Sequence, residues 1–436
     1  MADVIEQIEA FDCLAFDKEQ ITAEVIQAFI TSQQKNVFWF SPNFKPDDET
    51  MLAEYDYSRN CWKAGRFIGE ALFSHLGKNY RITIKPRFGE KILLRMLEEI
   101  FNIRITSSES QPGKTLEWKH YIRRIIALIW LQKLANANLY GLPKVQIKKE
   151  QKGQTIKGRL EIRKTIIALH RSDEAVSNYR EKHVDDTIAQ ILFQAHKILK
   201  ADFGVGSVNI PEAARDAIDQ IFTEIKSPKS VSENDYRNLR YKDIYLNWKP
   251  IVDLSWDIIK RKQVNLKQEK ANSGYGFFID MAEVWEQYLR SIMKRKLLPK
   301  GWLYKNEKLV AYKGFFFQRK LIPDLVFQRG NEIAIWDAKY KRMTGSFYDV
   351  DRADFFQIHT YIQYHLGDKK VKAAGLLYPI STSPNYAEYT SNHLINEQGL
   401  KMNFSIDGIE LIEKQENDNF KMAESDFMER LEKNLL

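Results

Sequence analysis

The sequence predicts a mixed α+β protein with α/β character, and three patterns along the chain indicate it. Residues 81–85 alternate between polar and apolar side chains at the period of a strand, and residues 91–101 repeat apolar side chains at helical spacing. Residues 184–264 hold mainly helical patterns, whereas residues 281–378 alternate between helix and strand patterns. With 436 residues, of which 44% are hydrophobic, the chain is long enough for two to three domains.

The first domain is expected to span residues 1–110 as a compact α+β module. Its helix places Leu93, Met96 and Leu97 on one face, which is typical of packing against a sheet. The polar run Ser107–Gly113 predicts a loop, and an amphipathic helix from Leu116 to Ala137 should follow it.

A strongly basic β-hairpin is predicted for residues 144–164, turning at Lys152-Gly153. The segment is a candidate surface for DNA or for a protein partner, because phosphate contact requires positive charge at backbone spacing. A solvated strand face would have the same composition, so both interpretations stay open. Its basic residues are Lys144, Lys148, Lys149, Lys152, Lys157, Arg159, Arg163 and Lys164.

Three helices should then form a stalk or bundle, at Asp185–Ala201, at Pro211–Ile225 after a break at Gly204–Gly206, and at Glu233–Lys262. The charged stretch Arg261–Gly274 loses apolar periodicity, which indicates a domain boundary near residue 270. We therefore expect domains at 1–110, 111–270 and 271–436.

The last domain should contain helices and strands in the order αβββαβ. The expected helices are residues 281–296 and 351–365, and the expected strands are residues 309–313, 315–327, 332–341 and 373–378.

Composition narrows the class of protein. The 66 Lys and Arg outnumber the 58 Asp and Glu, which gives a charge of +8 and favours either polyanionic partners or solubility alone. Cys13 and Cys61 are the only cysteines, so neither a disulfide framework nor a zinc site is expected, and a reducing cytoplasm fits. No signal peptide or membrane span is predicted. Gly113-Lys114-Thr115 ends like a nucleotide-binding loop, but Ser108 replaces its first glycine, so we expect no bound cofactor of that kind.

Two aspartates and a lysine form the best candidate site. Pro323-Asp324 and Asp337-Ala338-Lys339 flank a predicted hairpin in which Phe327 faces Glu332, so that Ile335 lies opposite Asp324. Because strand side chains alternate, Asp324, Asp337 and Lys339 should then share one face, with the two aspartates as diagonal neighbours.

Hydrolysis of a phosphodiester calls for such a set, since Mg²⁺ binds carboxylate and carbonyl oxygens and activates water. Asp324, Asp337 and the carbonyl of Ala338 are the candidate metal ligands. The alternative is a surface hairpin with charges facing water. The runs 325–327 and 333–336 are apolar on both faces, however, and this favours a buried ionisable cluster.

Polar residues on the flanking helices could join this site. Asp280 and Glu283 have the spacing of a capping box, and Glu286 could either face the site or pair with Arg290 one turn later. Gln357 and Tyr361 lie four residues apart on the later helix, where a bridging Gln and a core Tyr would give the same pattern.

These residues resemble the PD-(D/E)xK nuclease core, and more specifically the McrC family of McrBC restriction endonuclease subunits. Ala374–Pro379 is similar to the end of that core, and the segments 81–86 and 156–160 are similar to recurrent McrC segments. The resemblance implies catalytic roles for Asp324, Asp337, Lys339, Glu286 and Gln357.

The resemblance also implies how the subunit works. It implies Mg²⁺-dependent cleavage of double-stranded modified DNA, an McrB-like AAA+ GTPase hexamer as the partner, and GTP bound only by that partner. Residues 1–110 would dock to the partner and stimulate its GTPase. An autonomous repair or recombination nuclease, and a DNA-binding adaptor with a silent nuclease fold, are the alternatives.

Overall fold

The computed structural model divides the chain into two compact units, which we call the terminal unit (residues 1–102 and 269–436) and the middle unit (residues 103–268). The structure describes residues 5–17, 21–32, 37–40, 52–102, 118–203, 210–267, 275–306, 308–311, 314, 319–341, 343, 350–380, 394–395, 401–411 and 417–435. The expected loop at 107–113, the Gly113-Lys114-Thr115 sequence and the break at 204–206 lie outside these residues.

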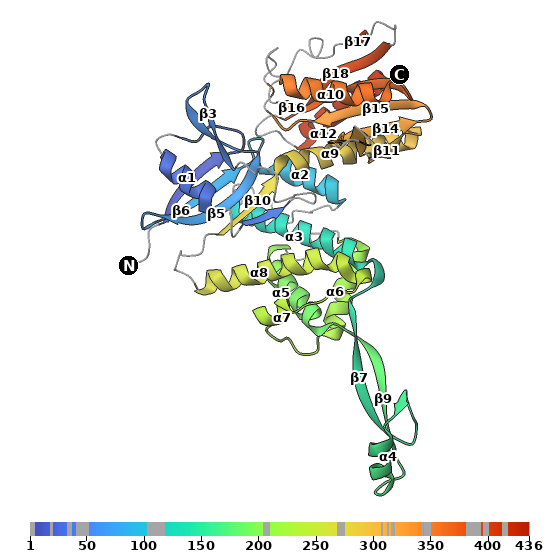
Figure 1. Ribbon diagram of the computed structural model, residues 1–436. Coiled ribbons are helices and arrows are strands. Elements are labelled where there is room, and N and C mark those ends of the chain that lie inside the picture. The colour runs from blue at the N-terminus through green and yellow to red at the C-terminus, as the bar shows by residue number, and fades with distance from the viewer. Residues whose placement is uncertain are drawn as a thin grey trace. The chain divides into compact units, whose positions relative to one another are not determined.

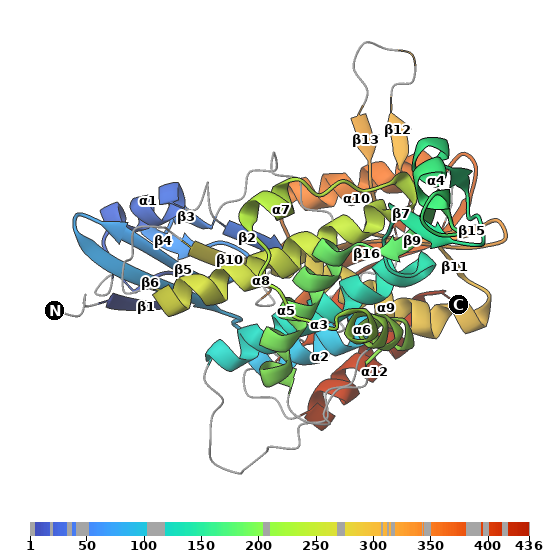
Figure 2. The same ribbon diagram turned by 90° about the horizontal axis from the view of Figure 1, so that it is seen from below.

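A five-stranded sheet forms the first part of the terminal unit, in the order β1-β6-β5-β10-β2. The strand β10 (Tyr275–Asp280) lies between β5 and β2, although it is about 200 residues away in the chain from its neighbour β5 (Figure 2). The other elements of this part are β1 (Ile5–Phe11), α1 (Ala23–Ser32), β2 (Val37–Phe40), β3 (Ala53–Asp56), β4 (Cys61–Ala64), β5 (Phe67–His75), β6 (Lys78–Lys85) and α2 (Glu90–Phe101).

The position of β10 corrects the expected domain limits. A domain of residues 271–436 would contain β10, yet this strand completes the sheet built from residues 5–85 and buries Phe278 in its core. The helix that follows β10 also contacts α2, where Ser291 Oγ donates to the carbonyl of Glu99 at 3.2 Å. Pairing between strands that are distant in sequence leaves no local signal, so the periodicity could not predict it.

The middle unit is a helical body with a long two-stranded arm (Figure 1). Trp130 and Trp248 are buried in the body, and the Trp130 indole donates to Ser255 Oγ at 2.8 Å. Its elements are α3 (Trp118–Ala137), η1 (Asn138–Tyr140), β7 (Lys144–Gly153), β8 (Arg159–Leu160), α4 (Ile162–Leu169), β9 (Ala175–Val184), α5 (Asp186–Phe203), α6 (Glu212–Glu224), α7 (Glu233–Arg237), η2 (Asp243–Trp248) and α8 (Lys249–Lys267).

The arm differs from the predicted hairpin of residues 144–164. The strand β7 pairs along its whole length with β9, from Lys144 opposite Val184 to Gly153 opposite Ala175. The short β8 joins the other side of β9, and α4 lies at the far end of the arm (Figure 1). The Lys152-Gly153 pair therefore ends a strand instead of forming a tight turn.

The predicted helix Glu233–Lys262 is also wrong as a single helix. The helix α7 ends at Arg237, and α8 begins at Lys249, directly before Pro250. Proline is favoured at the first positions of a helix and disrupts a helix interior, so Pro250 begins a new helix.

A second sheet of the terminal unit has the order β11-β14-β15-β16-β18-β17. At Gly375 of β16 a Cβ would lie 1.9 Å from the carbonyl oxygen of Ser405 in β18, so only glycine allows the two strands to approach this closely. The elements are α9 (Met281–Leu297), η3 (Leu298–Lys300), β11 (Leu303–Lys305), β12 (Leu309–Ala311), β13 (Arg319–Leu321), β14 (Leu325–Arg329), β15 (Glu332–Ala338), α10 (Arg352–His365), β16 (Lys370–Ile380), β17 (Leu394–Ile395), β18 (Lys401–Glu410) and α12 (Asn417–Leu435).

This region confirms the prediction of a mixed α+β fold, but two of the predicted strands differ from the observed ones. The strand next to β14 is β11, whereas β12 pairs with β13 in a separate two-stranded sheet. The expected strand 315–327 divides at Pro323, because proline cannot donate a ladder hydrogen bond.

No described helix is both long and apolar enough to cross a membrane. Cys13 and Cys61 are both free thiols.

Candidate active site

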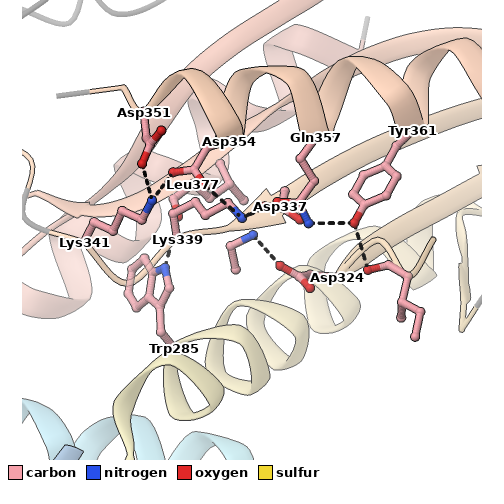
Figure 3. A network of polar contacts seen from close by, with 12 residues as sticks. Trp285, Asp324, Asp337, Lys339, Lys341, Asp351, Asp354, Gln357, Tyr361 and Leu377 are labelled. Atoms are coloured by element: carbon pink, nitrogen blue, oxygen red, sulfur yellow. Dashed lines mark hydrogen bonds and ion pairs between the residues drawn. The ribbon is translucent and has the colours of Figure 1, made fainter. Parts of the chain in front are cut away.

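The centre of the site is the hairpin of β14 and β15, where Asp324 precedes the first strand and Asp337 lies near the end of the second (Figure 3). Leu325 pairs with Trp336, so the same register places Asp324 opposite Asp337. The backbone amide of Ala338 donates to Asp324 Oδ2 at 2.8 Å. The three predicted residues Asp324, Asp337 and Lys339 therefore come together.

The register differs from the predicted one by two residues. Val326, and not Asp324, lies opposite Ile335, and Arg329 pairs with Glu332 across the tight turn. Gly330 has a φ of 58°, which suits a shorter turn than the expected four-residue turn. A shift of two keeps every side chain on its predicted face, so the two aspartates are direct instead of diagonal neighbours.

Lys339 lies among acceptor groups from two elements. Its ammonium is 2.5 Å from Asp337 Oδ2 and 3.4 Å from Asp354 Oδ1, and it donates to Gln357 Oε1 at 2.8 Å. Only 15% of its side chain is exposed. The backbone amide of Lys339 donates to the carbonyl of Leu377 at 2.9 Å, which fixes the end of β15 against β16.

Asp354 is a site residue that the sequence reasoning missed. It is buried on α10 and accepts ion pairs from Lys339 and, at 2.6 Å, from Lys341 (Figure 3). Its position three residues before Gln357 is the signal that could have identified it, since residues i and i+3 share a helix face.

Gln357 and Tyr361 form a chain of hydrogen bonds towards the loop before β14. Gln357 Nε2 donates to the Tyr361 hydroxyl at 2.8 Å, and this hydroxyl donates to the carbonyl of Ile322 at 3.3 Å. Gln357 therefore bridges Lys339 and Tyr361, and the pattern of a bridging Gln with a core Tyr is the one observed (Figure 3).

Burial raises the pKa of both aspartates at this site. Burial, together with the charges of Asp337 and Glu286, raises the pKa of Asp324 well above the ordinary aspartate value. Burial also raises the pKa of Asp337, against the opposing effect of the Lys339 ammonium. For Lys339 burial lowers the pKa, but Asp337 and Asp354 outweigh it and raise the pKa above the usual lysine value. Lys339 is thus a cation at neutral pH.

Glu286 interacts electrostatically with Asp337, but it also forms an ion pair with Arg290. Burial raises its pKa, the Arg290 guanidinium opposes this, and the charge of Asp337 adds to the rise. Glu286 forms an ion pair with Arg290, whose guanidinium also approaches the carbonyl of Asp324 at 3.4 Å. Asp280 caps the helix α9 by accepting a hydrogen bond from the amide of Ala282 at 2.9 Å.

Carboxylate and carbonyl oxygens are the groups at this site that could hold a metal ion. In the described part of the chain, no group of three or more His, Cys, Asp and Glu side chains is arranged to hold one. Two carboxylates are available, however: Oδ2 of the fully buried Asp337 is ion-paired with Lys339, and its Oδ1 accepts no hydrogen bond from the described residues. The amide of Ala338 points towards Asp324, and the carbonyl of the same extended residue lies on that side too. This set fits Mg²⁺, which usually takes one or two carboxylates and keeps several waters.

The basic residues of the arm are distant in sequence from this site and belong to the middle unit. Lys149 pairs with Glu181 at 2.6 Å, Lys152 pairs with Glu174 at 3.1 Å, and Lys164 pairs with Glu150. Three of the eight basic residues predicted for this segment are therefore paired with acidic neighbours on the arm itself.

Comparison with known proteins identifies the class to which this fold and site belong, that of restriction-system components. The family model described as "McrBC 5-methylcytosine restriction system component" matches residues 63–379, which include the middle unit and the Asp324–Lys339 cluster. The chain belongs to this McrBC family.

A solved structure agrees with this chain in fold. The chain resembles one from the half-complex of the tetradecameric assembly of Thermococcus gammatolerans McrB AAA+ hexamers with bound McrC, with 14% identity, a TM-score of 0.51, and coverage of 98% of this chain and 99% of that one. A chain of the Thermococcus gammatolerans McrBC complex matches less well, with 14% identity, a TM-score of 0.32 and coverage of 67% and 88%. No curated protein matches the chain.

Proposed function

We propose that this chain is the Mg²⁺-dependent DNA endonuclease subunit of a GTP-dependent, modification-dependent restriction system. The observation that carries the proposal is the pairing of Asp324 with Asp337 across a buried hairpin, with the Lys339 ammonium 2.5 Å from Asp337. Membership of the McrBC family supports the role in a restriction system, and the geometry of the site supports hydrolysis of DNA.

The arrangement of elements supports a PD-(D/E)xK type of core. The helix α9 precedes the hairpin, α10 follows it, and β16 then pairs in parallel with β15. The strand β15 lies inside the sheet, with β14 antiparallel on one side and β16 parallel on the other. Asp337, near the end of β15, and Lys339, directly after it, are therefore central and not at a sheet edge.

Asp324, Asp337 and the carbonyl of Ala338 would hold the metal. When bound, Mg²⁺ would activate water and offset the charge that develops on the phosphate. The residues of the chain supply the remaining tasks. Lys339 stays protonated, so it serves as a cation that orients water or balances phosphate charge and does not serve as a general base.

Lys339 needs a fixed position for that task, and α10 provides it. Asp354 and Gln357 contact the ammonium from one helix face, and Tyr361 fixes Gln357. Rigid secondary-structure elements hold reacting groups more accurately than loops do. Glu286 would take part only after leaving Arg290, which would then be free to contact phosphate.

The partner we propose is an AAA+ GTPase ring, because the structurally similar assembly contains McrB AAA+ hexamers with bound McrC. GTP would then be bound and hydrolysed by the ring, and modified DNA would reach this chain through the complex. A phage-defence role in the cytoplasm follows from the same proposal.

The far end of the arm is the surface that we assign to this partner. Five apolar side chains there are more than half exposed, and large exposed apolar patches mark protein contacts. They are Ile156, Ile162, Ile166, Ile167 and Leu169. Because several lysines of the arm are already paired with glutamates, the tip suits a protein better than a phosphate backbone.

The test uses the full-length chain with its cognate AAA+ GTPase, GTP, Mg²⁺ and a duplex containing 5-methylcytosine. We expect double-strand cleavage in the complete mixture and little when the chain is alone. Strong cleavage of unmodified duplex by the chain alone would favour an autonomous nuclease. A complete mixture in which wild type and Asp337→Ala behave alike would favour an adaptor with a silent nuclease fold.

A further inference from the structure

A buried charged cluster connects the first sheet with the segment that follows β15 and carries Lys339. Asp12 follows β1 and Arg87 follows β6, and because these strands are parallel their ends meet at one edge. The amide of Asp12 donates to the carbonyl of Lys85 at 3.0 Å, and the amide of Arg87 donates to Asp12 Oδ1 at 2.6 Å. The side chains of Asp12 and Arg87 are only 0% and 5% exposed.

The guanidinium of Arg87 lies against an aromatic ring from the nuclease sheet. It is 4.4 Å from the ring centre of Tyr340 and 4.7 Å from that of Phe88, and these two rings meet edge to face. The carboxylate of Asp12 is 3.9 Å from the guanidinium. Tyr340 is thus held by a cation and a ring that both come from residues 85–90 of the chain.

Tyr340 is the next residue after Lys339. The strand β15 ends at Ala338, and Tyr340 lies between two links to β16: the bond from the amide of Lys339 to the carbonyl of Leu377, and the bridge of Met343 to Ile380. Between these two links the Tyr340 ring is buried against Arg87 and Phe88, and this contact helps to fix the direction in which the backbone leaves Lys339.

We propose that Asp12, Arg87 and Tyr340 are positioning residues through which the first sheet holds Lys339 in place for catalysis. The proposal rests on the nuclease function proposed above. A desolvated cation on an aromatic ring is strongly directional, and a buried ion pair favours one arrangement over its alternatives. Any change in the edge formed by the ends of β1 and β6 is therefore transmitted to Lys339.

The burial of these groups agrees with a fixed cluster. Burial raises the pKa of Asp12, and the charge of Arg87 opposes this rise. For the fold alone, an apolar filler of the same volume often stabilises as well as a buried ion pair does. The charged set is better suited to specifying a single position for the residue beside Lys339.

The experiment compares Arg87→Met, Arg87→Lys, Tyr340→Phe and Tyr340→Ala in the full-length chain with its cognate AAA+ GTPase. The matched control is Arg81→Met, because Arg81 lies in the same sheet and pairs with Glu70 at 3.4 Å. Single-turnover cleavage, DNA affinity, Mg²⁺ affinity and the partner's GTPase rate are measured for each variant.

We expect Arg87→Met and Tyr340→Ala to lower the cleavage rate by roughly tenfold to a hundredfold, since small misplacement of a catalytic group has effects of that order. DNA affinity, Mg²⁺ affinity and the GTPase rate should stay at the wild-type level. Arg87→Lys and Tyr340→Phe should retain most of the wild-type cleavage rate, because the first keeps the cation and the second keeps the aromatic ring.

Two results would overturn the inference alone, provided that wild type cleaves and Asp337→Ala does not. One is a cleavage rate for Arg87→Met equal to that of Arg81→Met. The other is a parallel loss of cleavage, DNA affinity and Mg²⁺ affinity, which marks a general loss of structure. Absence of cleavage by the wild-type mixture would overturn the proposed function, and the inference with it.

Discussion

The ammonium of Lys339 lies 2.5 Å from the carboxylate of Asp337, and Lys339 directly follows the strand β15 that contains Asp337. The amide of Lys339 still bonds to β16, so the chain stays extended here, and residues two apart in extended chain point to the same face. The contact raises the pKa of Lys339, which therefore stays charged. It also offsets part of the negative charge of the buried Asp337 when no metal is bound.

The first prediction concerns Asp337. Replacing it with alanine should reduce DNA cleavage about a thousandfold, roughly 4 kcal/mol of barrier, because a metal ligand is removed. Partner binding should be unchanged. The control is Glu332→Ala at the other end of the same hairpin, which pairs with Arg329 on the surface and should cleave normally. Wild-type rates in Asp337→Ala would reject the site.

The second prediction separates charge from metal binding. Lys339→Ala should bind Mg²⁺ at least as well as wild type and yet cleave poorly, because the lysine competes for Asp337 and supplies a cation to the reaction. Calorimetry measures the affinity, and Lys370→Ala, at the exposed start of β16, serves as the control. Loss of Mg²⁺ binding in Lys339→Ala would assign the lysine an architectural role instead.

The third prediction concerns pH in the absence of metal. The pKa values of Asp324 and Asp337 are raised in the folded protein, so the folded state binds more protons than the unfolded state. These groups therefore stabilise the fold below the ordinary aspartate pKa of about 4, and this stability is lost as the pH rises through their raised values.

Asp324→Asn removes one of these ionisable groups, so less stability should be lost as the pH rises. The free energy of unfolding at neutral pH should increase by about 1 kcal/mol, and DNA cleavage should be abolished. Mg²⁺ prefers the ionised carboxylates, so its binding should release protons. Calorimetry in two buffers of different ionisation enthalpy measures the release. Stability that increases with pH in this range would contradict the assigned pKa directions.

The fourth prediction distinguishes two uses of the arm. Ile166→Asp with Ile167→Asp should weaken binding to the AAA+ ring, because it places charge in the exposed apolar tip. Replacing Lys148, Lys149 and Lys152 with glutamate should have only a small effect on the affinity for DNA. Two of these lysines are already paired with acidic side chains.

Salt titration separates these contacts, because each phosphate contact contributes about 0.9 to the slope of log K against log salt. An unchanged ring affinity in the isoleucine variant, together with a smaller salt slope in the lysine variant, would assign the arm to DNA.

The fifth prediction concerns division of the chain at residue 270. A fragment 1–270 lacks β10 and exposes the edges of β5 and β2, and a fragment 270–436 carries β10 without its neighbours. Unpaired strand edges promote aggregation, so each fragment alone should be poorly soluble, and co-expression should restore a soluble complex. Two fragments that fold separately, shown by gel filtration and circular dichroism, would contradict the pairing of β10.

Local pattern was sufficient for part of this protein. The sequence indicated α9, α10, β15 and β16 close to their observed limits, because strand and helix periods are carried by neighbouring side chains. It also placed Asp324, Asp337 and Lys339 on one face despite a register error of two residues, since parity survives an even shift. Roles for Glu286 and Gln357 stay predictions.

Tertiary structure decided the rest. The pairing of β7 with β9, the insertion of β10 into the first sheet, and the contact of Arg87 with Tyr340 all join residues that are far apart in the chain. Asp354 was overlooked for the same reason, because its lysine partners lie on another element. Sequence period determines which face a side chain occupies, whereas the partner of that face depends on how the whole chain packs, and the packing leaves no local mark in the sequence.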